Sequence, residues 1–231
     1  MNMSTTRLSV SLAKHTIGIS GAVPDRADWS EPAMDRAVLE FVSLFSAIVF
    51  KYGGRIVHGC HPTFTPVILH QARLHGSGRK QKPVTLIMSS LWTKMTPSDF
   101  AEGVSDIAEL YVTKQIGEGG PENNDARNRS LTLMRQTLID YQNVMVAVGG
   151  KMHNKDGKKP GVGEEMDLAA LKNIPRFLIA GLGGFSAEYA RDLTPSSLNN
   201  GLSDEENRFL FSTKDISSCV NVLFDKLAGL R

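Results

Sequence analysis

The chain has 231 residues, of which 41% are hydrophobic, and its 26 Lys and Arg residues nearly balance its 24 Asp and Glu residues, leaving a formal net charge of +2. This length and apolar content suit one α/β domain with a buried core. The mild charge argues against nucleic-acid binding, for which a dense basic stripe is typical.

Two cysteines, Cys60 and Cys219, lie far apart and fit neither a metal-binding spacing nor a disulfide framework. We therefore expect reduced thiols in a cytoplasmic protein. The polar N-terminal segment shows no secretory signal. The longest apolar segment, residues 37–50, is too short to cross a bilayer, so we expect no membrane association.

Short β-type runs alternate with helical periodicity along the chain, which is typical of a parallel sheet with helices on both faces. We predict strands at residues 16–20, 55–59, 84–88, 108–113, 144–148 and 176–180. We predict helices at residues 32–52, 66–74, 126–142, 163–172, 186–192 and 214–230. The pattern predicts a Rossmann-like three-layer α/β/α sandwich with a mainly parallel sheet. We expect a single domain, with its core at residues 14–193 and the last helix packed against an edge of the sheet.

Four of the predicted strands end in glycine-rich turns. The glycines are Gly21, Gly59, the pair Gly149-Gly150, and Gly181 with Gly183-Gly184. Because the carboxyl ends of parallel strands meet at one edge of a sheet, these turns should share a rim where a phosphate or ribose can bind. Glycines that serve tight turns alone are the competing explanation.

The most informative stretch follows the strand at 144–148. It combines glycines, a lysine and paired acids in the order Gly149, Gly150, Lys151, Gly161, Gly163, Glu164 and Glu165. A strand that ends in glycines and leads to a helix N-terminus is a common way to hold a phosphate. The leucine stripe of the helix predicts that Glu164 lies over the sheet rim, although favourable interaction with the helix dipole would also explain an acid there.

Further candidate ligand contacts come from the neighbouring segments. Arg127 and Arg129 precede the 144–148 strand and should face the rim, where a guanidinium can clamp a phosphate, while Arg135 is expected at the surface. In the segment His58-Gly59-Cys60-His61, the spacing is too tight for a usual zinc site, so we expect no metal. We favour His61 as a hydrogen-bond donor to a ligand.

Taken together, these segments resemble the SLOG superfamily, Rossmann-like relatives of the LOG phosphoribohydrolases, which release a base from a nucleoside monophosphate. LOG enzymes place an arginine on a helix, then a strand, then Pro-Gly-Gly-x-Gly-Thr-x-Glu-Glu. This chain has the same order, and its Gly18-Ile19-Ser20-Gly21 turn and the strand at 53–59 are also similar. The resemblance spans most of residues 16–184, and its specific parts are the Gly-Gly and Gly-x-x-Glu-Glu pieces.

The chain departs from the LOG pattern in three places. Ala147-Val148 replaces Leu-Pro, residues 151–160 are inserted between the two halves of the motif, and Val162 replaces the threonine. The longer loop with Lys151 is similar to SLOG domains associated with TIR and sirtuin-type proteins of bacterial defence, which are understood to sense nucleotide-derived signals such as cyclic ADP-ribose isomers. The resemblance implies phosphate contacts from Lys151 and one of the two arginines, and a ribose contact from one of the two glutamates.

Two functions compete at this stage. The favoured one is a cofactor-free sensor of an ADP-ribose-like or cyclic nucleotide signal, acting as a homo-oligomer or with a TIR or other effector protein. The alternative is a nucleotide N-glycosidase or deoxyribosyltransferase-like enzyme with Glu164 and Arg129 as catalytic residues. A third possibility is an oligomeric scaffold with a decayed site, using the apolar helix at 37–50 as its dimer surface, although burial against the sheet explains that helix better. The predicted ligand contacts are Ser20, Gly21, Gly59, His61, Arg127, Arg129, Gly149, Gly150, Lys151, Gly161, Gly163, Glu164 and Glu165.

Overall fold

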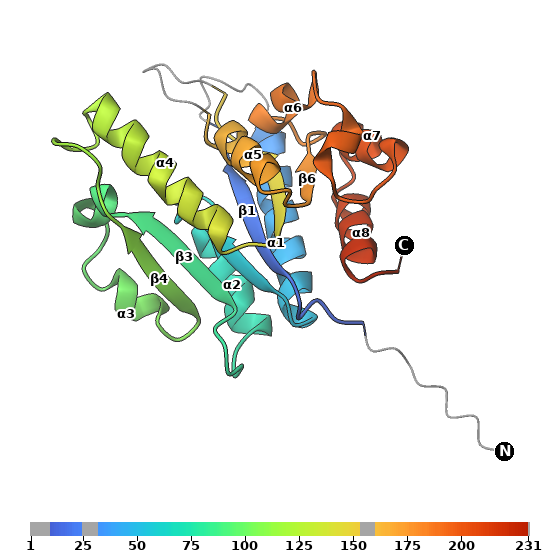
Figure 1. The fold of residues 1–231 in the computed structure, drawn as a ribbon. Coiled ribbons are helices and arrows are strands. Elements are labelled where there is room, and N and C mark those ends of the chain that lie inside the picture. Colours follow the sequence, from blue (N-terminus) through green and yellow to red (C-terminus); the bar gives the residue numbers. More distant parts are fainter. Residues whose placement is uncertain (1–9, 25–31, 153–159, 231) are drawn as a thin grey trace.

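The computed structural model describes residues 10–24, 32–152 and 160–230, and shows a twisted central sheet with helices on both faces (Figure 1). The six strands of the sheet are all paired in parallel, in the order β4-β3-β2-β1-β5-β6. They are β1 (Thr16–Ala22), β2 (Arg55–His58), β3 (Val84–Ser89), β4 (Ala108–Thr113), β5 (Val144–Gly149) and β6 (Arg176–Ile179). The predicted Rossmann-like α/β/α fold is therefore confirmed.

The helices form one layer on each face of the sheet (Figure 1). One layer contains α1 (Pro32–Lys51), α2 (Thr65–His75) and α8 (Ile216–Leu227). The other contains α4 (Asn124–Asp140), α5 (Gly161–Leu171) and α6 (Phe185–Ala190). The connections add the short helices η1 (Ser90–Met95), α3 (Phe100–Val104), η2 (Pro195–Leu198) and α7 (Asp204–Ser212).

Strand β5 shows why the central strands are apolar without interruption. All six of its residues are buried. Val144, Val146 and Val148 belong to the core shared with α1 and α8, whereas Met145 and Ala147 belong to the core shared with α5. A parallel strand covered on both faces needs apolar side chains in both directions, so the sequence shows a run instead of an alternation.

Helix α1 is part of the core. Phe41, Phe45 and Phe50 are fully buried, and the first two rings stack with centroids 5.6 Å apart. The large apolar side chains of this helix thus pack against the sheet. This packing accounts for its composition and leaves no need for the dimer surface considered above.

The C-terminal part of the chain differs from the prediction. Between the predicted helices at 186–192 and 214–230, where no element was predicted, lies α7, which begins with a capping box in which Ser203 and Glu206 each bond the other's backbone N–H. It is α7 that covers the β6 edge, where Gly181 N–H donates to Leu210 O at 3.1 Å. The last helix, α8, packs against α1, and its buried residues belong to the same core as residues of β6. No helix among the described residues is long and apolar enough to cross a membrane.

Candidate functional site

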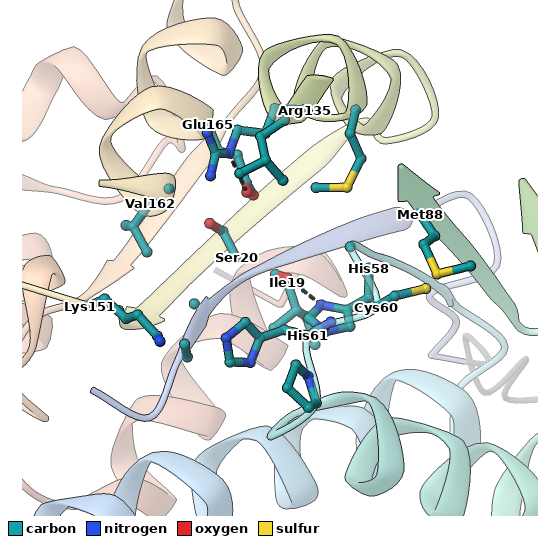
Figure 2. A pocket seen from close by; sticks show the side chains of 18 of the residues that line it. Ile19, Ser20, His58, Cys60, His61, Met88, Arg135, Lys151, Val162 and Glu165 are labelled. Atoms are coloured by element: carbon teal, nitrogen blue, oxygen red, sulfur yellow. Dashed lines mark hydrogen bonds and ion pairs between the residues drawn. The ribbon is translucent and has the colours of Figure 1, made fainter. Parts of the chain in front are cut away.

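A cavity of about 570 Å³ opens at the carboxyl edge of the sheet, beside the point where the strand order reverses between β1 and β5. This switch point is where doubly wound sheets usually bind their ligands, and the volume is in the range of small-molecule sites. The walls come from the ends of β1, β2 and β3, the turn after β5, the first turn of α5 and one face of α4 (Figure 2).

The turn after β5 brings backbone into the wall of the cavity. Gly150 has φ +96°, and a Cβ at this position would lie 2.6 Å from Val162 Cγ2. Its N–H donates to Ala22 O at 2.7 Å, and its carbonyl accepts from Phe185 N–H at 3.1 Å. The glycine therefore allows β1, β5, α5 and α6 to meet closely at one corner.

The start of α5 presents backbone N–H groups beside this corner. Gly161 and Val162 line the cavity, and the Glu164 N–H donates to O of Pro160, the residue before the helix, at 3.1 Å. The N–H groups of the preceding residues have no acceptor within the helix, and they carry the positive end of the helix dipole. Lys151 lines the same part of the cavity (Figure 2). This end of the cavity is suited to an anion.

Helix α4 contributes one stripe of side chains to the opposite wall. Arg127, Leu131 and Met134 follow one another at helical spacing and all line the cavity. Arg127 donates from Nη1 to Pro121 O at 2.8 Å and from Nη2 to the Asn124 side chain. The Arg127 guanidinium is therefore fastened to the loop that precedes α4 while it borders the cavity.

The two other arginines of α4 lie in different surroundings from those expected. Arg129 is 59% exposed, forms an ion pair with Asp125 at 3.4 Å and does not line the cavity. Arg135, expected at the surface, is only 12% exposed and lines the cavity. The reason is helical geometry: Arg135 lies about 80° around the helix from Arg127, next to Leu131 and Met134, whereas Arg129 lies about 200° from Arg127.

A buried network joins α4 to the acids of α5. Arg135 forms an ion pair with Glu164, which also accepts a hydrogen bond from the Thr132 hydroxyl. Arg135 Nε lies 3.7 Å from Glu165 Oε1, and a Cβ added to Gly161 would lie 3.0 Å from Arg135 Nη2. Glu164 is thus held between the helices and does not line the cavity, although the sequence placed it over the rim. Glu165 is the acid that lines the cavity.

The environment of Glu165 controls its protonation. Its side chain is 18% exposed, faces Ser20 and lies beside Arg135 (Figure 2). Burial raises the pKa of Glu165 above its ordinary value, and the Arg135 charge and the Ser20 hydroxyl oppose that rise. A carboxyl group in this setting can accept a hydrogen bond from a ligand hydroxyl or take part in proton transfer.

The histidine segment forms part of the floor. His58 shares a hydrogen bond with Ile19 O at 2.9 Å through Nδ1 and accepts from the His61 N–H through Nε2 at 3.2 Å. Burial lowers the pKa of His58, so the ring is neutral and already satisfied. Burial also raises the pKa of the Cys60 thiol to about 12. Across the described part of the chain, no three His, Cys, Asp or Glu side chains are grouped as metal ligands would be.

The structure brings most of the predicted contact residues to one cavity. Those that line it are Ser20, Gly21, Gly59, His61, Arg127, Gly150, Lys151, Gly161 and Glu165. Those that do not are Arg129, Gly149, Gly163 and Glu164. Gly163 instead packs against the Phe185 ring, which a Cβ would approach to 2.8 Å. The ligand-binding roles themselves stay predictions.

Several lining residues were not foreseen. Arg135, Leu131 and Met134 come from α4, and Met88 and Trp92 come from the end of β3 and from η1. The α4 residues carried a usable signal, because Arg127, Leu131, Met134 and Arg135 fall on one helical face. Met88 and Trp92 carried none, since an apolar strand end and a short 3-10 turn look like core in a sequence.

Comparisons with known proteins agree with this architecture. The family model described as SLOG cluster2 matches residues 15–197. Among solved structures, the chain is similar to the X-ray structure of TM1055, a structural genomics target, with a TM-score of 0.54, 13% sequence identity, and coverage of 90% of this chain and 98% of that chain. At that identity the likeness concerns the fold alone. No curated protein matches the chain. The family match covers most of the chain, and the protein belongs to the SLOG cluster2 family.

Proposed function

We propose that the cavity binds a nucleotide-derived ligand and that the protein is a sensor of an ADP-ribose-like or cyclic nucleotide signal in bacterial antiviral defence. The main support is that one cavity, at the switch point of the sheet, contains both a region suited to bind an anion and a buried carboxylate. The anion-binding region is formed by Gly150, Lys151 and the first turn of α5, and the carboxylate belongs to Glu165. Phosphate and ribose hydroxyl are the ligand groups that fit these two partners. Membership of the SLOG cluster2 family supports the same class of ligand.

The alternative function is hydrolysis or transfer at an N-glycosidic bond. One observation favours it: Glu165 is a cavity-lining carboxyl group whose pKa is raised by burial, as is common for general acids and bases. Against it, Glu164 is committed to Thr132 and Arg135, so one carboxylate remains available to a ligand. Ligand binding requires only this one carboxylate, so we favour the sensor function.

A direct experiment separates the two functions. The purified chain is incubated with AMP, NAD⁺ and ADP-ribose, and free base is sought by chromatography while thermal unfolding is followed in parallel. A ligand at 100 times its Kd should stabilise the fold by about 2.7 kcal/mol, or roughly 5–10 °C for a chain of this size. Stabilisation without base release supports the sensor, base release overturns it, and neither effect with any nucleotide overturns both functions.

The two glutamates should respond differently to loss of charge. Glu165→Gln is expected to weaken nucleotide binding about tenfold, because a charge-assisted hydrogen bond to the ligand is lost, and to abolish base release if the chain is an enzyme. Glu164→Gln should leave affinity within about threefold and act on stability instead, because its partners are Thr132 and Arg135. Isothermal titration calorimetry and thermal unfolding of both variants check this. Equal losses of affinity would contradict the assignment of Glu165.

The proposal extends to how a signal would be passed on. A sensor needs an effector, and the family resemblance points to a separately encoded TIR or other effector protein, with the SLOG chain acting as a homo-oligomer in the cytoplasm. Size-exclusion chromatography of the chain with and without the stabilising nucleotide tests the oligomer. A ligand-independent monomer would argue against that part of the proposal and leave the ligand site unaffected.

A further inference from the structure

The cavity has two chemically different ends. Lys151 and Val162 lie at one end and Met88 and Cys60 at the other, with Ser20, Glu165 and Arg135 between them (Figure 2). The first end is the anion-suited corner. The second is bounded by β3, η1 and α4, and no ion pair or metal-ligand group occurs there among the residues that the structure describes.

We propose that this second end, formed by Met88, Trp92, Leu131 and Met134, is the subsite for a planar aromatic base, so that the ligand class is a base-bearing nucleotide and not a sugar phosphate or polyphosphate alone. This inference rests on the proposed function. It assigns the base of the ligand to the apolar end of the cavity and the phosphate to the end that is suited to an anion.

Two thioether side chains line this end of the cavity. A Cβ placed on Gly59 would lie 3.5 Å from Met134 Cε and 3.3 Å from Leu138 Cδ1, so the end of β2 packs directly against these α4 side chains. Met134 and Met88 are each 7% exposed, and both line the cavity. Thioether sulfur makes favourable contacts with aromatic ring edges, and such side chains adapt to flat ligands.

The segment that carries Trp92 is tethered to the sheet. The Thr96 hydroxyl lies 3.4 Å from Met88 Sδ and 3.0 Å from Trp92 O, which ties η1 to the end of β3. Trp92 is only partly buried and lines the cavity. Indole rings stack on every nucleobase, because each base has a π-face.

The uncharged side chains of the subsite favour a base over a phosphate. His58 is held neutral by its two hydrogen bonds, and the Cys60 thiol stays protonated in its buried setting. A cation close to Leu131 and Met134 on the lining face of α4 is Arg127, whose guanidinium already donates to Pro121 O and to the Asn124 side chain. A phosphate moved among the apolar side chains would lose hydration that this tethered guanidinium only partly replaces, whereas an uncharged ring carries no such cost. The ligand is therefore oriented, with its ring toward η1 and its phosphate toward Lys151.

Affinity measurements on the full chain test the subsite with two probes that differ only in the base, AMP and ribose 5-phosphate. The wild-type chain should bind AMP at least tenfold more tightly. Trp92→Ala should weaken AMP binding about tenfold and leave ribose 5-phosphate within about twofold. The matched control is Phe209→Ala, another partly exposed aromatic side chain that does not line the cavity, and it should change neither affinity. Equal effects of Trp92→Ala on both probes would overturn the subsite.

A spectroscopic readout keeps the test valid even if the alanine variant is unstable. The chain contains two tryptophans, Trp29 and Trp92, so Trp29→Phe leaves Trp92 as the single indole fluorophore. AMP should quench its emission and ribose 5-phosphate should not. Binding of AMP by calorimetry with no change in emission overturns the base subsite while the proposed function stands. Failure of AMP, NAD⁺, ADP-ribose and ribose 5-phosphate alike to bind overturns the proposed function and the subsite together.

Discussion

Replacing Arg135 by methionine is expected to lower the free energy of unfolding by about 3–5 kcal/mol, because the change leaves two buried carboxylates without their shared cation. Arg135 is 12% exposed and lies against Glu164 and Glu165, whose side chains are 11% and 18% exposed. Methionine keeps most of the side-chain volume, so the loss reports the charge and not a cavity. Urea unfolding of the variant and the wild-type chain measures the difference.

The pH dependence of this loss identifies its cause. Burial already raises the pKa of Glu165, and removal of the Arg135 charge takes away the main influence that opposes the rise. The folded variant then binds protons that the unfolded chain releases, so its stability falls as pH rises and recovers as pH falls. The deficit should therefore be larger at pH 8 than at pH 5.

Arg129→Met provides the matched control. Arg129 is 59% exposed and its ion pair with Asp125 lies at the surface, so the expected change is within about 0.5 kcal/mol. Losses of similar size in the two variants, or a deficit for Arg135→Met that does not change with pH, would contradict the buried network as the source of stability.

A second large effect is expected at the corner that places the candidate site. Gly184→Ala should destabilise the fold by about 3 kcal/mol or more, since φ +67° and ψ −164° lie in a region that is essentially restricted to glycine. The added Cβ would also lie 2.5 Å from the Gly149 backbone carbon. The strand end and α6 must then separate, which displaces Gly150 and weakens nucleotide binding as well. Thermal unfolding and calorimetry follow the two effects.

The control for this change is Gly78→Ala. Gly78 also has positive φ, at +78°, but a Cβ there meets nothing within 4 Å. It should cost about 1–2 kcal/mol, the ordinary penalty for an alanine in a left-handed conformation, and leave binding unchanged. The difference between the two variants isolates the close approach of α6 to the end of β5. Equal costs would mean that this contact is looser than the structure indicates.

The order of strands and helices could be predicted well from local patterns. Apolar runs such as Val144 to Val148 lie on buried parallel strands, and their length and bordering glycines distinguish them from helices. The boundaries of the predicted elements differ from those of the structure by at most three residues, and all six strands begin where predicted. The helix at Asp204–Ser212 was missed although Ser203 and Glu206 carry a capping box, because its polar composition resembles a loop.

The chain alone also indicated that glycine turns and the start of α5 would meet, since the ends of parallel strands share an edge by topology. It did not show which side chains point into the cavity. Helix α5 turns by about 100° per residue, so its rotation about its axis settles whether Glu164 or Glu165 faces a ligand, and that rotation depends on Arg135 and Thr132 of another helix. Likewise, Met88 and Trp92 join the site only because β3 lies two strands from β1 and η1 folds back over its end. Such contacts join residues that are distant in the chain, so they cannot be predicted from the local periodicity of the sequence.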